Sequence, residues 1–187
     1  NKERACEEIG IKSETIHLSQ ETEEEELLSL IDRLNSDPSV HGVLVQLPLP
    51  EQIREQEVIE RISAKKDVDC FHPENVGRIF TGNPLFVPCT PNGIIELFRH
   101  YEISLQGKEV LIVGRSNIVG KPLVGLLLKE NATVTIAHSR TKDLAKVTKR
   151  AQVLIVATGV ARLITEEMVK EGAVVIDVGT TRVPSDK

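Results

Sequence analysis

A loop with two glycines in the second half of the chain carries the strongest chemical signal. Residues 113–122 read Val-Gly-Arg-Ser-Asn-Ile-Val-Gly-Lys-Pro and lie between a strand-like run and a helix-like one. Glycines in such a place let the backbone approach phosphate oxygens, and a helix N-terminus offers unpaired N–H groups and partial positive charge. The spacing departs from Gly-x-Gly-x-x-Gly, so a plain connecting turn remains an alternative. We predict a dinucleotide site that uses Gly114, Arg115, Ser116, Ile118, Val119 and Gly120.

The stretch after the next strand-like run indicates which dinucleotide binds. An NAD site ordinarily has Asp or Glu there to accept hydrogen bonds from the ribose 2′-hydroxyl. Here residues 138–142 are His-Ser-Arg-Thr-Lys, and the first carboxylate is Asp143. The hydroxyls and cations of this stretch, together with Arg115, suit a 2′-phosphate, although a solvated basic turn is the alternative. The pattern favours NADP over NAD, held here by Ser139, Arg140 and Thr141.

Three polar residues of the first half attract notice separately. Gln46 ends a buried-looking Val/Leu run, at the place where open α/β sheets bind their ligands. Lys2 is by its type alone a solvated charge, and Asp69, near Asp67, could simply cap a turn. Their spacing does not join the three into one site.

The second half must position the loop through a βα repeat. Short runs rich in β-branched residues alternate with helix-like stretches, and Asn131 and Gly172 close two of the helices. This alternation predicts a doubly wound parallel sheet of Rossmann type. The predicted strands are 109–113, 133–137, 153–157 and 173–178, and the predicted helices are 121–130, 142–150 and 165–171.

The first half also alternates helix and strand. A helix over 2–9 ends at Gly10, and a capping box of Thr22 and Glu25 starts a helix that stops before Pro38. This order predicts parallel pairing through right-handed crossovers. The remaining predicted elements are an extended stretch at 12–18, a strand at 42–50 and a helix at 51–62.

The two halves meet in a long connection. Residues 63–90 show little periodicity, and Thr90 with Pro91 is typical of a helix start. We expect an α/β protein of two α/β domains around a cleft, a partial substrate domain at 1–91 and a partial Rossmann domain at 92–187.

Composition narrows the class of protein. The 187 residues carry 23 Lys+Arg against 28 Asp+Glu and only five aromatic side chains, four Phe and one Tyr. A mildly acidic chain with few stacking rings is a poor nucleic-acid binder. No apolar run approaches the roughly 20 residues that span a bilayer, and three cysteines without CxxC spacing predict no metal site and no disulfide framework. We therefore expect a cytoplasmic protein without a membrane partner. The sequence starts at Asn1 and ends just past a strand-like run, so we also expect it to be an internal piece of a longer protein.

Seven sequence blocks in order give the chain a resemblance to a known family. It resembles the bifunctional methylenetetrahydrofolate dehydrogenase/methenyltetrahydrofolate cyclohydrolases over essentially its whole length. The blocks are Lys-Glu-Arg-Ala-Cys-Glu-Glu-Ile-Gly (2–10), Gly-Val-Leu-Val-Gln-Leu-Pro-Leu-Pro (42–50), Lys-Asp-Val-Asp (66–69), Phe-His-Pro-Glu-Asn-Val-Gly (71–77), Pro-Cys-Thr-Pro-Asn-Gly (88–93), Gly-Arg-Ser-Asn-Ile-Val-Gly-Lys-Pro (114–122) and Val-Ile-Asp-Val-Gly (175–179).

The resemblance implies a two-step reaction on a small-molecule folate. NADP+ takes hydride from 5,10-methylenetetrahydrofolate, and water then opens the methenyl cation to 10-formyltetrahydrofolate. Lys2 and Gln46 match the family's catalytic lysine and its glutamine partner, Asp69 matches the aspartate that holds the pterin, and Thr180 lies beside the expected nicotinamide pocket. The resemblance further implies a homodimer, a place in one-carbon metabolism and a link to purine biosynthesis.

Departures from the family pattern leave alternatives open. The tyrosine that accompanies the lysine would precede Asn1, Cys70 stands where the family usually has Gly, and Thr180-Thr181 replace Ile-Asn. An inactive folate- or nucleotide-binding relic of the same fold is one alternative. Another two-domain NADP dehydrogenase of shikimate type is the second, although such an enzyme is not expected to carry the 42–50 and 66–69 blocks.

Overall fold

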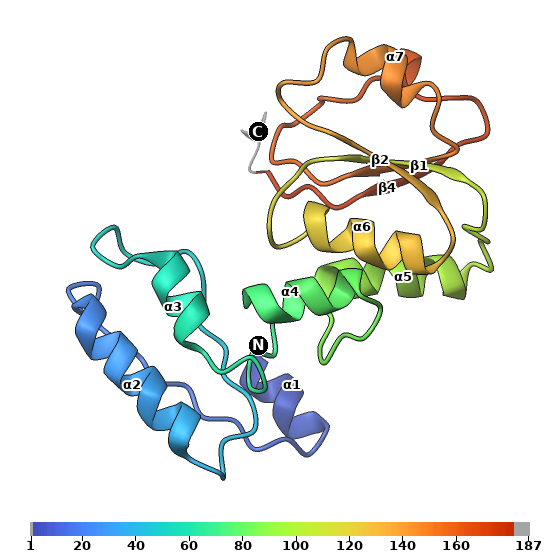
Figure 1. Cartoon of the computed structure of the whole chain (residues 1–187). Coiled ribbons are helices and arrows are strands. Elements are labelled where there is room, and N and C mark those ends of the chain that lie inside the picture. The colour runs from blue at the N-terminus through green and yellow to red at the C-terminus, as the bar shows by residue number, and fades with distance from the viewer. Residues whose placement is uncertain (1, 182–187) are drawn as a thin grey trace.

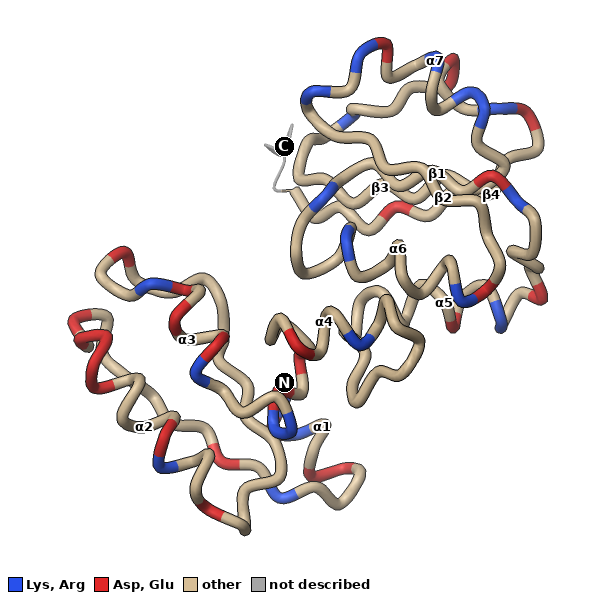
Figure 2. The backbone as a smooth tube through the Cα atoms, viewed as in Figure 1, with Lys and Arg blue, Asp and Glu red and all other residues tan. Residues whose placement is uncertain are grey.

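The computed structural model describes residues 2–181, which form a helical first half and a sheet-containing second half (Figure 1). No helix in this described part is long and apolar enough to cross a membrane. Acidic and basic residues are interspersed along both halves (Figure 2). The helices are α1 (Lys2–Glu8), α2 (Glu24–Ser36), α3 (Glu55–Arg61), α4 (Pro73–Phe80), α5 (Cys89–His100), α6 (Gly120–Lys129) and α7 (Leu144–Thr148), with a 3₁₀ turn η1 (Glu166–Met168).

The second half is built on a four-stranded parallel sheet. Its strands β1 (Glu109–Val113), β2 (Thr133–Ala137), β3 (Val153–Val156) and β4 (Val174–Asp177) stand in the order β2-β1-β3-β4. Alternate side chains enter two cores: Val110 and Ile112 join the core that includes Leu123 of α6, and Leu111 and Val113 pack with α7. Helices on both faces (Figure 1) confirm the doubly wound prediction.

The sequence located the strands of this half more accurately than its helices. Each predicted strand is observed within two residues of its bounds, and Asn131 and Gly172 have φ of 60° and 73° at the turns where they were expected. The predicted helix at 165–171, however, is only the short turn η1. None of the η1 residues is buried, so this segment has little buried apolar surface to stabilise a longer helix.

The strand predicted at 42–50 does not form in the described structure. Val43 alone pairs, in an isolated parallel bridge to Asp67, and residues 12–18 form no strand either. A ladder needs consecutive backbone N–H groups, which Pro48 and Pro50 lack. The predicted parallel relation between these segments is therefore present at one residue pair only.

Two predicted helix caps are wrong, and one helix was missed. The N-cap of α2 is Glu23, and Thr22 is buried with its carbonyl accepting a hydrogen bond from the Gln52 side chain. Helix α5 starts at Cys89, so Thr90 lies inside it. Helix α4 stands within the predicted long connection: His72 Nδ1 accepts from the Glu74 N–H at 3.1 Å, and proline follows at the first helical position.

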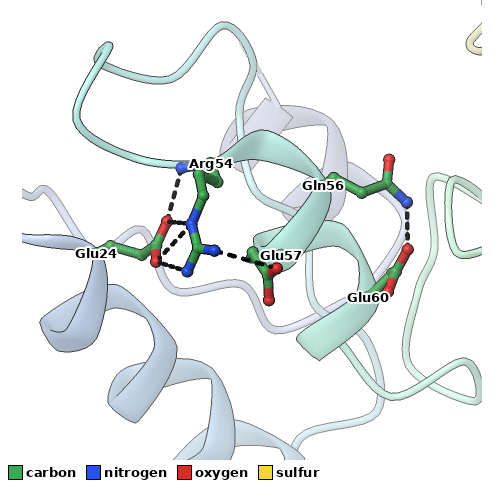
Figure 3. Close-up of polar contacts among 5 residues, drawn as sticks. All are labelled: Glu24, Arg54, Gln56, Glu57 and Glu60. Carbon is green, nitrogen blue, oxygen red and sulfur yellow. Dashed lines mark hydrogen bonds and ion pairs between the residues drawn. The ribbon is translucent and has the colours of Figure 1, made fainter.

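Polar contacts fasten α2 to α3 and to the segment that carries the aspartates. The Glu24 carboxylate accepts from the Arg54 guanidinium and from the Arg54 backbone N–H at 2.7 Å, and Figure 3 also shows the Arg54–Glu57 and Gln56–Glu60 contacts. The Lys66 ammonium donates to three carbonyls at the C-terminal end of α2, at 2.7 to 2.8 Å. A cation there complements the helix dipole, so this lysine is a helix cap.

The segment between the halves packs with the second half. Cys70, Ile79 and Ile94 share one core cluster with Val110 and Leu123. Helix α4 lies against α6, where a Cβ atom added at Gly125 would come within 2.7 Å of the Ile79 side chain. Packing therefore links residues 70–91 to the Rossmann sheet, and the domain boundary after residue 91 stays a prediction.

Candidate active site

Lys2 and Gln46 form a direct pair although 44 residues separate them. Helix α1 presents Lys2, whose Nζ donates to Gln46 Oε1 at 2.8 Å. The amide nitrogen of Gln46 donates to the Leu47 carbonyl at 2.9 Å, which fixes the amide so that its oxygen faces the lysine. The pair is exposed and therefore open to a ligand.

Asp69 belongs to the same group. Partial burial raises the pKa of the Asp69 carboxyl; the nearby Lys2 ammonium opposes this rise in pKa, and Asp67 adds to it. Because the Lys2 ammonium acts on the Asp69 carboxyl, Asp69 lies near the Lys2–Gln46 pair. The structure therefore brings together Lys2, Gln46 and Asp69, which their spacing in the sequence did not join. With Val43, Leu47 and Phe71, Asp69 lines a hollow of about 10 Å³. That is room for about one water molecule, so the described residues provide polar anchors rather than an enclosed pocket for a pterin.

Cys70 follows Asp69 with an unusual backbone. Its φ is 61°, in the left-handed region that favours glycine, and its side chain is fully buried. Burial, with a smaller contribution from Asp67, raises the pKa of the thiol to about 12, so Cys70 is not a nucleophile at neutral pH. Its Sγ instead donates to the Phe86 carbonyl at 3.3 Å.

We expect Cys70→Gly to be more stable than Cys70→Ala by about 1 kcal/mol, because only glycine adopts a positive φ without strain. Both variants lose the buried thiol, so comparing them isolates the backbone effect. Urea unfolding of the two proteins measures the difference. The usual order, with alanine more stable than glycine, would show that the backbone at residue 70 is unstrained.

The glycine loop lies at the carboxyl ends of β1 and β3, where the sheet changes winding direction. Gly114 has φ of 127°, and a Cβ atom there would collide with the Ala157 carbonyl; a Cβ atom at Gly120 would collide with the Gly114 carbonyl. Ser116 Oγ accepts from the N–H groups of Val119 and Gly120 at 3.2 and 3.3 Å. The serine thus shapes the loop, and its hydroxyl hydrogen remains available to a ligand.

The loop after β2 lies at the same edge, because β1 and β2 are paired and the Gly114 N–H donates to the Ala137 carbonyl. His138 N–H donates to Thr141 Oγ1 at 2.8 Å, and Arg140 N–H donates to His138 Nδ1 at 3.1 Å. Ser139 and Arg140 are exposed. The Asp143 carboxylate caps α7 by accepting from Lys146 N–H, so it is already engaged in a hydrogen bond within the chain. Arg140 and Lys142 form no ion pair with any described residue, and together with the nearby hydroxyls they fit a 2′-phosphate, and hence NADP.

A third loop at this edge contains Thr180 and a residue that the sequence analysis missed. A Cβ atom at Gly179 would collide with the Thr158 carbonyl, so the chain after β4 crosses close to the end of β3. Thr180 is exposed there. Thr158 Oγ1 is buried without a hydrogen-bond partner within residues 2–181. In the sequence, the Ala-Thr-Gly segment that directly follows β3 is the feature that could have drawn attention to Thr158.

The structure therefore assembles two groups of predicted residues. Lys2, Gln46 and Asp69 form one, and the loops after β1, β2 and β4 form the other at the carboxyl edge of the sheet. Among the described residues, no hydrogen bond or ion pair joins the first group to the second. The roles of these residues remain predictions.

Comparison with known proteins decides the family. Residues 1–69 match the catalytic domain of the tetrahydrofolate dehydrogenase/cyclohydrolases, and residues 88–187 match their NAD(P)-binding domain. The chain belongs to this family. Among its members, the bifunctional protein FolD of Streptococcus agalactiae is 56% identical over 97% of this chain, and that of Halalkalibacterium halodurans is 60% identical over 98%. The chain spans 64% and 66% of the lengths of these two relatives.

Solved structures of family members superpose closely on the described chain. The crystal structure of the FolD methylenetetrahydrofolate dehydrogenase/cyclohydrolase from Campylobacter jejuni matches with a TM-score of 0.95 and 50% identity, covering 100% of this chain and 66% of that one. The Trypanosoma brucei enzyme, complexed with NADP cofactor and inhibitor, matches with a TM-score of 0.92 and 37% identity, covering 98% of this chain and 63% of that one. These matches support the two-domain α/β fold.

Proposed function

We propose that the protein containing this chain oxidises 5,10-methylenetetrahydrofolate with NADP+ and hydrolyses the methenyl product to 10-formyltetrahydrofolate. Family membership supports the proposal, and the observation that carries it is the 2.8 Å contact between Lys2 Nζ and Gln46 Oε1 beside Asp69. An exposed amine and amide beside a half-buried carboxylate provide a proton carrier, a group that orients it and an anchor for a heterocycle.

Asp69 anchors the folate in this proposal. A pterin edge presents adjacent N–H donors, which a carboxylate can accept together in a charge-assisted bidentate contact. The neighbouring Lys2 ammonium favours the ionised form of Asp69 that this contact needs. Asp69 therefore sets the direction of the ring, and thereby the position of the one-carbon bridge.

Lys2 supports the hydrolytic step. A cationic methenyl group in front of an ammonium favours loss of the lysine proton, so the amine can accept a proton from the attacking water. Gln46 Oε1 holds Nζ in position while the proton moves. General acid–base catalysis of this kind contributes roughly 10²- to 10⁴-fold.

The second group of residues holds the cofactor. Bound NADP+ supplies the hydride acceptor, and the protein's part is to fix the two rings relative to each other. The tight glycine loop accommodates the pyrophosphate, Arg115, Ser139, Arg140 and Thr141 hold the 2′-phosphate, and Thr180 lies on the nicotinamide side.

We expect the double variant Arg115→Ala/Ser139→Ala to raise the KM for NADP+ by about 10- to 100-fold, the equivalent of one or two charge-assisted hydrogen bonds. The KM for NAD+ should change less than about twofold, because NAD+ lacks the 2′-phosphate that these side chains would bind. Initial rates with each cofactor measure both values, and Lys129→Ala at the far end of α6 is the control. Equal losses for the two cofactors would exclude this site for the 2′-phosphate.

We further propose that the protein acts in the cytoplasm as a homodimer formed through its second domain, within one-carbon metabolism that supplies purine biosynthesis. The three cysteines are free, which suits a reducing compartment. The decisive experiment mixes the full-length protein with methylenetetrahydrofolate and NADP+ or NAD+ and follows reduced cofactor by absorbance. Rapid NADPH formation supports the proposal; bound folate without turnover would identify a relic.

A further inference from the structure

A second aspartate lies buried two residues before Asp69. Asp67 is only 3% exposed, and its Oδ2 accepts two hydrogen bonds of 2.9 Å, from the His72 N–H and from Asn75 Nδ2. Both donors belong to the start of α4. A buried carboxylate must be held by donors in this way, so the loop that carries Asp69 is fixed to α4 at one flank.

Asn75 is completely buried, and its surroundings allow only one orientation of its amide. Its Nδ2 also donates to the Ala64 carbonyl at 2.8 Å. The Ala64 carbonyl and the Asp67 carboxylate can only accept hydrogen bonds, so the amide nitrogen of Asn75 must face them. Its Oδ1 is left buried without a partner among the described residues. An unpaired buried carbonyl costs stability. The two hydrogen bonds that Asn75 Nδ2 donates, to the Ala64 carbonyl and the Asp67 carboxylate, offset this cost.

The other flank of Asp69 is fixed as well. The Cys70 N–H donates to the Asp67 carbonyl at 3.3 Å, and the Cys70 side chain is buried against the Phe86 carbonyl. Asp69 therefore stands between two anchored residues. Its own carboxyl has no hydrogen-bond partner among the described residues, so its direction depends on these anchors.

Helix α4 transmits this anchoring to the second half. Ile79, one turn after Asn75, packs against Gly125 of α6, the helix that follows the glycine loop. The contacts form a continuous chain from Asp69 through Asp67, Asn75 and Ile79 to α6.

We propose that Asn75 is a positioning residue: by holding the Asp67 carboxylate, it aims Asp69 at the folate and fixes it relative to the cofactor-binding half. The inference rests on the proposed function and extends it to two residues, Asp67 and Asn75, that do not touch substrate.

The test compares Asn75→Leu with Ile95→Ala in the full-length protein. Leucine has the shape of asparagine without its donors, whereas Ile95→Ala removes a buried side chain of α5 from the same core and leaves the Asn75–Asp67 and Ile79–Gly125 contacts in place. We expect Asn75→Leu to raise the KM for methylenetetrahydrofolate about tenfold while kcat and the KM for NADP+ change less than threefold. Ile95→Ala should lower the thermal midpoint at least as much and leave the folate KM within twofold.

An equal rise in folate KM in both variants would overturn the inference, since it would follow from lost stability alone. An unchanged folate KM in Asn75→Leu would also overturn it. If Asn75→Leu does not fold, Asn75→Ser, which retains one donor, should raise the folate KM about threefold at constant NADP+ KM, and no rise would refute the role. A wild-type protein that never reduces NADP+ would instead refute the proposed function.

Discussion

Replacing Lys2 by methionine in the full-length protein should lower the cyclohydrolase rate by at least 100-fold. Methionine keeps the length of the side chain and removes the group that carries the proton, and general acid–base catalysis contributes roughly 10²- to 10⁴-fold. The contact to Gln46 Oε1 would disappear with the ammonium. Hydrolysis of methenyltetrahydrofolate, followed by the loss of its absorbance, measures the rate directly.

Lys12→Met is the matched control for this experiment, because Lys12 is an exposed lysine of the same half that has no side-chain contact to Gln46 or Asp69. It should hydrolyse the substrate at the wild-type rate. If Lys2→Met kept more than a tenth of the wild-type rate, Lys2 would not be the proton carrier.

The second large effect is expected for Asp69→Asn, which should lower kcat/KM for methylenetetrahydrofolate about 10- to 100-fold. An amide offers one acceptor where the carboxylate offers two, and it lacks the charge that strengthens the contact to the pterin. Loss of one such hydrogen bond corresponds to this range. Initial rates at varied folate concentration and saturating NADP+ measure the change.

The same variant should gain stability as the pH rises. Burial raises the pKa of Asp69 in the folded protein above its ordinary value of 3.8, so ionisation of Asp69 opposes folding once the pH rises above 3.8. Asparagine cannot ionise, and the thermal midpoint of Asp69→Asn relative to wild type should therefore increase from pH 3 to pH 7.

Asp32→Asn is the control with the opposite sign. The Asp32 carboxylate accepts two hydrogen bonds of 2.6 Å from Arg61, and these bonds lower its pKa. Ionised Asp32 favours folding above its folded-state pKa, so Asp32→Asn should lose stability relative to wild type over the same pH interval and keep the wild-type kcat/KM. A fall in the relative midpoint of Asp69→Asn with rising pH would contradict the assigned cause of its shift.

Local sequence was sufficient to predict the sheet of the second half. Residues 110–113, for example, form a short apolar run that is buried on both faces of the sheet, and this pattern can be recognised from the residues themselves. Helix α4 was harder to predict, because its cap is a histidine and its buried positions include Asn75, a residue that normally indicates a loop. Residues 42–50 have the composition of a strand, but only Val43 has a pairing partner in the described structure.

The sequence by itself determined the Rossmann half, indicated NADP as the cofactor and, through family blocks, identified which lysine, glutamine and aspartate to examine. Periodicity, turn residues and the lack of a carboxylate after β2 are properties of neighbouring residues, so they can be seen along the chain. Only the tertiary structure decided that Lys2 reaches Gln46 and that Asp67 and Asn75 hold the loop of Asp69. Lys2 and Gln46 are 44 residues apart in sequence, and the Asp67–Asn75 contact is buried, so both contacts arise only when helices and loops pack together.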